Sequence, residues 1–193
     1  MKEKILMILF ILLLGSVLST TLVSVDKYTA PLIEKNKTRK LYVSILKALD
    51  ITFTEDKVDK AFEENVITKK QEEINFYIAR AGGDIAFEIK GSGLWGPVHG
   101  IIALRPDLKT IKAITIIHQE ETPGLGGRIG ESDFLNKFKS KKILPRLIIQ
   151  PPGKASKNNE VDGITGATLS CKAFEQILNS EIEKYVSIFK EHK

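Results

Sequence analysis

The first feature of the chain is a run of apolar residues near its N-terminus. No charged residue occurs from Ile5 to Val25. As a helix, this run would reach roughly 31 Å at about 1.5 Å per residue, which matches a hydrocarbon core of about 30 Å. A cleaved signal peptide is the alternative, but its apolar stretch usually has only about 7–15 residues before a small-residue cleavage site, and no Ala-x-Ala sequence directly follows this run. We therefore expect a transmembrane helix over residues 5–25.

Beyond this run, the hydrophobic pattern changes between helical and strand-like periods. Apolar residues recur at helical spacing in 41–49 and again in 58–66, which predicts two helices. Four β-rich segments separated by glycine or proline turns predict an antiparallel meander: Ile74–Ala79, Asp84–Ile89, Val98–Leu104 and Lys109–His118. Residues 133–138 predict a short helix and residues 146–150 a further strand. An apolar stripe with three- and four-residue spacing predicts a long amphipathic helix from about Ala167.

These elements predict an α+β fold, with an N-terminal transmembrane helix followed by a domain whose antiparallel sheet packs against helices. We expect the transmembrane helix over 5–25, a helical linker over 26–70 and the globular domain over 71–193. Lys2 and Lys4 precede the span, and positive residues beside a first span tend to stay in the cytoplasm. The globular domain is therefore expected on the outer face of a bacterial-type cytoplasmic membrane.

Composition and charge exclude several classes of protein. The 193 residues are 42% hydrophobic and 27% charged, which is typical of neither a disordered chain nor a polytopic membrane protein. The net charge of +5 calls for a test of nucleic-acid binding, but the densest basic run contains one aromatic residue, Phe138, and not the series of aromatic residues that stack on bases. That run consists of Lys137, Lys139, Lys141, Lys142 and Arg146. We expect a solvated face or one near anionic membrane lipid, and no nucleic-acid partner.

The residues with the clearest chemical meaning lie where the last helix begins. Residues 161–170 read Val-Asp-Gly-Ile-Thr-Gly-Ala-Thr-Leu-Ser. The two glycines allow a tight turn, and the first N–H groups of a helix lack internal partners, so such an end attracts phosphate. The hydroxyl of Thr168, in the first turn, would be within bonding reach of that phosphate. The alternative is that Asp162, Thr165 and Thr168 only cap the helix.

A second candidate is the glycine-rich loop over residues 119–130. Glycines such as Gly126 allow close backbone approach to a flat ligand, and Leu125 offers an apolar surface. Glu121 and Thr122 can hydrogen-bond the edge of a ring. The loop matches neither of the common phosphate-loop patterns. A plain surface turn is the alternative, and burial of the loop against a ligand would distinguish the two.

A few isolated residues also carry potential chemistry. Trp95, the only tryptophan, either stacks on a ring or fills the core. His99 and His118 lack companions at metal-ligand spacing, so we expect no metal site. Cys171 is the only cysteine, which permits no intrachain disulfide. It follows Thr168 by three positions and is expected to be a small core residue.

The segment Asp162-Gly-Ile-Thr165-Gly166-Ala167-Thr168-Leu-Ser170 resembles the flavinylation signature D-x-x-[ST]-G-A-T-x-[ST] of FMN-binding domains. These domains include the C subunit of the sodium-pumping NADH:quinone oxidoreductase (Nqr) and the G subunit of the Rnf complex. In that family the last Thr of G-A-T receives FMN through a phosphoester bond, made by a separate magnesium-dependent flavin transferase with FAD as donor. The resemblance implies that Thr168 carries covalent FMN. It also implies that the transferase reads Asp162, Thr165 and Gly166.

Two further segments resemble the same family in the same order. Gly93-Leu94-Trp95 resembles its G-L-W stretch, and Glu121-Thr122-Pro123-Gly124-Leu125-Gly126 resembles its E-T-P-G-L-G loop. The resemblance spans about residues 91–177, so the domain over 71–193 is identified as an FMN-binding domain. It implies an electron relay whose partners are the other membrane subunits of an Rnf- or Nqr-type complex, with the flavin supplying the redox chemistry.

This chain combines features of the two branches of the family, the Nqr C subunit and the Rnf G subunit. Its G-L-W stretch and its double glycine at Gly126 and Gly127 are more similar to the Nqr C subunit, whereas its length is closer to the Rnf G subunit. On length we expect an Rnf-type subunit, with the Nqr C subunit as the alternative. Two other hypotheses are a stand-alone extracytoplasmic FMN carrier and a non-redox module whose helix end binds phosphate reversibly.

Overall fold

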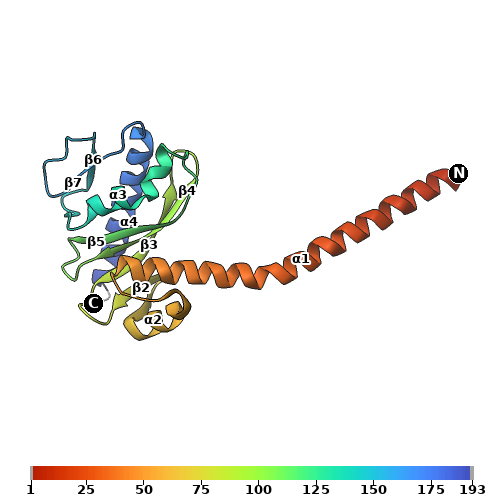
Figure 1. The fold of residues 1–193 in the computed structure, drawn as a ribbon, viewed down its shortest axis with the longest axis horizontal. Coiled ribbons are helices and arrows are strands. Elements are labelled where there is room, and N and C mark those ends of the chain that lie inside the picture. Colours follow the sequence, from red (N-terminus) through yellow and green to blue (C-terminus); the bar gives the residue numbers. More distant parts are fainter. Residues whose placement is uncertain (1, 192–193) are drawn as a thin grey trace. The chain divides into compact units, whose positions relative to one another are not determined.

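The structure, a computed structural model, describes residues 2–191, so the last two residues of the predicted domain lie outside it. It contains two compact units, one up to Lys40 and one from Leu41 onward. Figure 1 labels the α-helices and most of the strands. The elements, with η for a short 3-10 helix, are α1 (Lys2–Ala48), η1 (Glu55–Lys57), α2 (Val58–Asn65), β1 (Val66–Gln71), β2 (Ile74–Ala79), β3 (Ile85–Ser92), β4 (Pro97–Leu104), β5 (Ile111–Gln119), η2 (Gly126–Gly130), α3 (Ser132–Leu135), η3 (Asn136–Phe138), β6 (Ile148–Gln150), β7 (Glu160–Asp162) and α4 (Thr168–Glu191).

The first unit is helical throughout its described part, and its apolar side chains are exposed. Within residues 2–191, α1 is the one helix that is long and apolar enough to cross a membrane, by length and composition. Its hydroxyl side chains donate hydrogen bonds to carbonyl groups four residues earlier, as Ser16 does to Leu12 at 2.8 Å and Thr20 to Ser16 at 2.8 Å. These polar groups are therefore satisfied within the helix itself.

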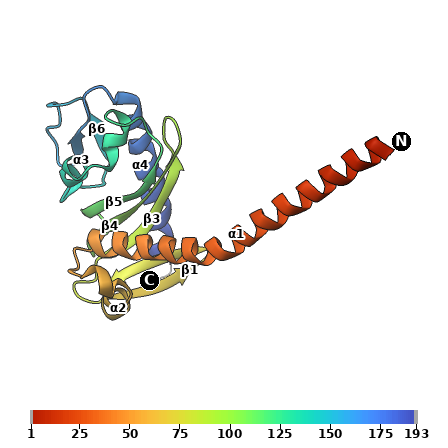
Figure 2. The ribbon, with the colours of Figure 1, turned by 45° about the vertical axis from the view of Figure 1, so that its right-hand side comes forward.

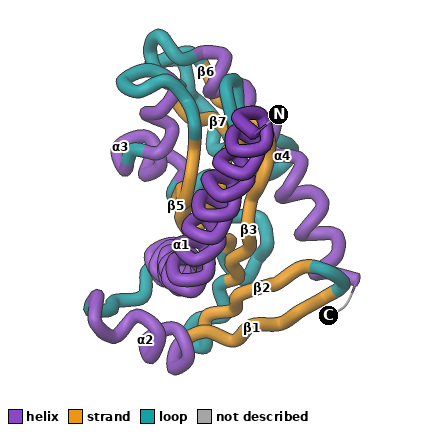
Figure 3. The backbone as a smooth tube through the Cα atoms, turned by 90° about the vertical axis from the view of Figure 1, so that its right-hand side faces the viewer, coloured by secondary structure: helices purple, strands orange, loops and turns teal. Residues whose placement is uncertain are grey.

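The second unit is built on a five-stranded sheet with the order β1-β2-β3-β4-β5, in which each neighbouring pair is antiparallel. Figure 3 shows these strands beside α4. The predicted meander is confirmed for β2 to β5. β1 was not predicted, because its four central residues are all exposed and show no alternation. The exposed lysines Lys69 and Lys70 suit the edge of a sheet, where they oppose pairing with another chain.

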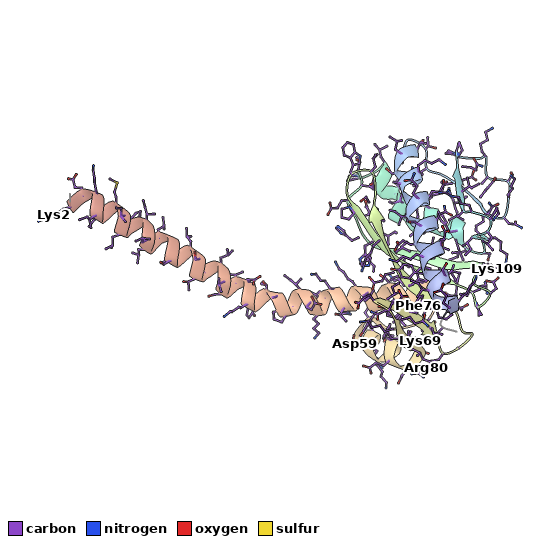
Figure 4. The ribbon with its side chains drawn as sticks, turned by 180° about the vertical axis from the view of Figure 1, so that it is seen from behind. Lys2, Asp59, Lys69, Phe76, Arg80 and Lys109 are labelled. Carbon is purple, nitrogen blue, oxygen red and sulfur yellow. The ribbon has the colours of Figure 1, made fainter. Side chains whose placement is uncertain are left out.

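α4 covers one face of the sheet and contacts β3 (Figure 2). Its apolar stripe brings Tyr185 to 4.7 Å from Phe87 and Phe189 to 5.1 Å from Phe76, measured between ring centroids. Phe76, labelled in Figure 4, is almost fully buried there. Burying such rings removes a large apolar area from water, which stabilises this layer. The long amphipathic helix predicted from about Ala167 is confirmed.

The other face of the sheet has a separate core, made by the last turns of α1 and by α2. Ile45 and Leu46 of α1 are completely buried, and Phe62 of α2 packs edge-on against Tyr77 of β2 at 6.0 Å between centroids. The linker boundary expected between residues 70 and 71 therefore lies inside the second unit. The physical reason is that β1 is a strand of the sheet and that the last turns of α1 pack on one face of it.

Candidate functional site

The candidate site begins at the entrance of α4. The chain reaches it through Gly166, whose φ of +82° is a conformation that glycine adopts without steric cost. The N–H of Ala167 donates to Ile164 at 3.1 Å, and the N–H of Cys171 donates to Ala167 at 2.9 Å. The N–H groups between them, those of residues 168–170, have no backbone acceptor within the described residues. This helix entrance thus presents three free donors and the positive end of the helix dipole.

Thr168 is exposed in this first turn, and no side-chain hydrogen bond involves it or Thr165 within residues 2–191. The alternative that these threonines and Asp162 cap the helix is therefore wrong. Asp162 instead accepts hydrogen bonds from the backbone N–H groups of Ala155 at 3.0 Å and Lys154 at 2.9 Å. These bonds hold the preceding loop and, with that of Ala155 as the main cause, lower the pKa of Asp162.

A cleft of 270 Å³ opens beside Thr168. It brings together three segments that are far apart in the sequence: the turn between β3 and β4, the glycine-rich loop and the first turn of α4. Its lining residues are Leu94, Trp95, Thr122, Leu125, Gly126, Gly166, Ala167, Thr168, Leu169 and Ser170. Eight of the residues predicted for the site line this cleft, and Asp162, Thr165 and Glu121 do not.

The cleft has an apolar rim that the solvent reaches. Trp95 is 74% exposed and Leu125 is 48% exposed, so the alternative that Trp95 fills the core is excluded. Leu94 and Leu169 belong to the same rim and were not predicted. The signal for Leu169 was available, since it is an apolar residue directly after Thr168 at a helix entrance. Exposed apolar side chains gathered at a cleft are a feature of ligand-binding or interaction surfaces.

Glu121 has a different place from the one predicted. It is only 4% exposed and lies behind the cleft, where both carboxylate oxygens already accept hydrogen bonds. Oε1 accepts from the backbone N–H groups of Leu94 at 2.6 Å and Trp95 at 3.1 Å. Oε2 accepts from the Ser170 hydroxyl at 2.7 Å. Its contacts are thus made within the protein and not with the edge of a ring.

Cys171 is 3% exposed and is confirmed as a core residue. Its thiol lies 3.4 Å from the N–H of Ile164, which donates to it. Burial raises the pKa of this thiol, so the neutral form is favoured. The side chain packs behind the helix entrance and fixes the turn that precedes Thr168.

The two sheet histidines, His99 on β4 and His118 on β5, lie outside the cleft, each within hydrogen-bond distance of a glutamate. His99 lies 2.9 Å from Glu88, which also pairs with Lys90 at 2.6 Å. The hydrogen bond with His99, with help from Lys90, lowers the pKa of Glu88 to about 2. His118 lies 3.0 Å from Glu120. In the part of the chain that the structure describes, no group of three His, Cys, Asp or Glu side chains could hold a metal ion.

Fold and site together define a class: an α+β domain in which a free helix entrance, an apolar-rimmed cleft and a glycine-rich loop lie around the exposed hydroxyl of Thr168. Such a domain suits a ligand with a phosphate at one end and an apolar group at the other. Residues 93–183 match the family described as FMN-binding domain. The resemblance drawn from the three sequence segments is confirmed.

Two similar proteins are C subunits of Na(+)-translocating NADH-quinone reductases. The one from Neisseria meningitidis serogroup A is 37% identical over 98 residues, which cover 48% of this chain and 38% of the relative. The one from Haemophilus ducreyi is 35% identical over 96 residues, which cover 47% of this chain and 37% of the relative. The matched region thus spans less than half the length of these relatives.

Two solved structures share the fold, and both are C subunits of the same kind of reductase. The one from Parabacteroides distasonis has a TM-score of 0.70 and 24% identity, covering 81% of this chain and 94% of that one. The one from Shewanella oneidensis, NqrC, has a TM-score of 0.66 and 16% identity, covering 75% of this chain and 91% of that one. The predicted α+β fold class is confirmed.

Proposed function

We propose that the chain is a membrane-anchored flavoprotein subunit that carries FMN in a phosphoester bond on Thr168 and relays electrons in an ion-translocating complex of the Nqr or Rnf type. The observation that carries this proposal is the exposed Thr168 hydroxyl, which has no side-chain hydrogen bond within residues 2–191. It stands at the helix entrance, in a complete flavinylation signature and beside an apolar cleft.

The residues around Thr168 fit FMN in their chemistry. The free N–H groups of residues 168–170 would donate to phosphate oxygens. Leu94, Trp95 and Leu125 would offer apolar and aromatic surface to the flavin ring. Thr122, on the rim of the same cleft, would supply a hydroxyl for a polar ring edge. Bound in this way, FMN would accept and donate electrons singly or in pairs.

Attachment would follow from the exposure of the Thr168 hydroxyl. With FAD as donor, the Thr168 oxygen forms a bond to phosphorus, the diphosphate bond of FAD breaks, and AMP leaves as the hydroxyl proton is released. A flavin transferase would have to reach this hydroxyl, and Thr165, Gly166 and Leu169 are exposed around it. A covalent bond keeps the site filled where free FMN is too dilute to saturate it by mass action.

The N-terminal helix would be the membrane anchor. Its apolar residues 5–25 would lie in lipid with Lys2 and Lys4 on the cytoplasmic side, and the FMN-binding domain would lie on the periplasmic or extracellular side. The partners would be the other membrane subunits of the complex, because the relatives named above are subunits of such an assembly. Copurification of several membrane subunits supports this assignment, whereas a solitary protein would indicate a stand-alone FMN carrier.

The attachment is tested by expressing the full chain with a flavin transferase and illuminating a denaturing gel with ultraviolet light. We expect a fluorescent band whose intact mass includes one FMN, and a dark band for Thr168→Ala. Thr68→Ala is the matched control, because Thr68 is an exposed threonine on β1, and its band should fluoresce. A dark wild-type band, or a fluorescent Thr168→Ala band, would exclude attachment at this residue.

A further inference from the structure

Glu121 connects the three segments that surround the cleft. It reaches the turn between β3 and β4 through the N–H groups of Leu94 and Trp95, at 2.6 and 3.1 Å. It reaches the first turn of α4 through the Ser170 hydroxyl at 2.7 Å. Glu121 itself stands at the start of the glycine-rich loop. Removing its side chain would leave two backbone donors and one hydroxyl without an acceptor.

The surrounding glycines leave room for this carboxylate. A Cβ on Gly93 would overlap Oε1 of Glu121 and lie 2.9 Å from the carbonyl oxygen of Gly96. A Cβ on Gly126 would overlap the Ser170 oxygen and lie 2.7 Å from Oε2 of Glu121. Neither glycine has a positive φ, so close approach to the carboxylate, and not backbone conformation, requires the absence of a side chain at these two positions.

Ser170 occupies the last position of the flavinylation signature, yet it is only 3% exposed. Its hydroxyl donates to the buried Glu121 carboxylate, so little of the side chain is left for a second protein to contact. Thr168, two residues earlier, is exposed in the same turn. The first turn of α4 thus has one hydroxyl that faces the protein and one that faces outward.

We infer that Glu121 and Ser170 form an internal clamp that orders the Leu94–Trp95 turn against the entrance of α4, and that Glu121 is a positioning residue for the acceptor Thr168. In this inference, Ser170 is part of the flavinylation signature because its hydroxyl donates a hydrogen bond to Glu121. A direct contact between Ser170 and the transferase is not required. The first half of this inference concerns the protein without cofactor. The second half, the effect on Thr168, rests on the proposed function.

The clamp is tested first without flavin, by hydrogen–deuterium exchange of the full chain in detergent micelles, produced in a host that lacks the transferase. We expect exchange of the Leu94 and Trp95 amides to be about tenfold faster in Glu121→Ala than in the wild type, because a hydrogen bond to a charged acceptor is lost. Glu121→Gln, which keeps an acceptor oxygen, should be intermediate. Glu120→Gln is the matched control, since Glu120 is exposed and pairs with His118, and should match the wild type.

The exchange rates of the β3 and β4 amides report whether a variant is folded. If the Glu121→Ala variant loses protection in these strands, the rates at Leu94 and Trp95 are compared in Glu121→Gln instead. Exchange at Leu94 and Trp95 that is equal in wild type and in folded Glu121 variants would overturn the clamp.

The second arm adds the transferase and FAD and measures the initial rate of FMN incorporation by intact mass. We expect Ser170→Ala and Glu121→Ala to slow incorporation about tenfold or more, and Glu120→Gln to leave it unchanged. The double variant Glu121→Ala/Ser170→Ala should be no slower than the slower single variant, because both changes remove the same contact. Additive losses would indicate that the transferase reads Ser170 directly and would overturn the assignment. If the wild type takes up no FMN, the proposed function is wrong. The hydrogen–deuterium exchange experiment then still tests whether Glu121 and Ser170 form the clamp.

Discussion

Replacing Gly126 with alanine tests how closely the glycine-rich loop and α4 are packed behind the cleft. An added Cβ would overlap the Ser170 oxygen, and it would also lie 2.7 Å from Oε2 and 3.1 Å from Cβ of Glu121. Neither neighbour is free to move, because the two are hydrogen-bonded to each other at 2.7 Å. The Ser170 hydroxyl must rotate away, or the loop must shift from the helix.

The size of the effect follows from three contributions. Overpacking a close-packed site costs about 1–3 kcal/mol, and weakening a hydrogen bond to a charged acceptor costs about 1.5–3 kcal/mol. Restricting the unfolded chain offsets about 0.4–1 kcal/mol of this loss. We expect the free energy of unfolding to fall by about 2–4 kcal/mol. For a domain of this size, that lowers the melting temperature by roughly 5–10 °C.

The assay is thermal unfolding of the full chain in detergent, followed by circular dichroism. Gly130→Ala is the matched control, because Gly130 is in the same short helix η2 and its added Cβ would meet no atom closer than 3.8 Å. We expect this control to melt at or slightly above the wild-type temperature. Equal melting temperatures for the two variants would refute the reasoning that steric closeness behind the cleft stabilises the site.

Two further predictions follow from titratable groups. Glu88 has an ordinary pKa of 4.5 that is lowered to about 2 in the folded protein, so its stabilisation is complete above pH 4.5 and is lost as the pH falls toward 2. Glu88→Gln should remove about 1–2 kcal/mol of stability at about pH 7 and little at about pH 2, and a pH-independent difference would contradict this. The buried Cys171 thiol, with its raised pKa, should react with a thiol reagent at about pH 8 at least about tenfold more slowly in the native protein than in urea. Equal rates would show that the thiol is accessible.

Several features could be predicted from the sequence because they depend on neighbouring residues. The length of the uncharged run from Ile5 to Val25 predicts a membrane-spanning helix. The spacing of apolar residues predicts α4 and the strands from β2 to β5. The flavinylation signature is also contiguous, so Thr168 could be placed at a helix entrance. β1 was missed because its exposed residues carry no such period.

The sequence by itself determined the helices α1 and α4, the strands from β2 to β5, their order and the candidate acceptor Thr168. Only the tertiary structure decided that Trp95 is exposed at a cleft, that Asp162 holds a loop and does not cap α4, and that Glu121 lies behind the cleft. The physical reason is that the contacts of Glu121 join segments separated by 26 to 49 residues along the chain. Local periodicity carries no information on such contacts, whereas packing the glycine-rich loop between the sheet and α4 brings the groups together.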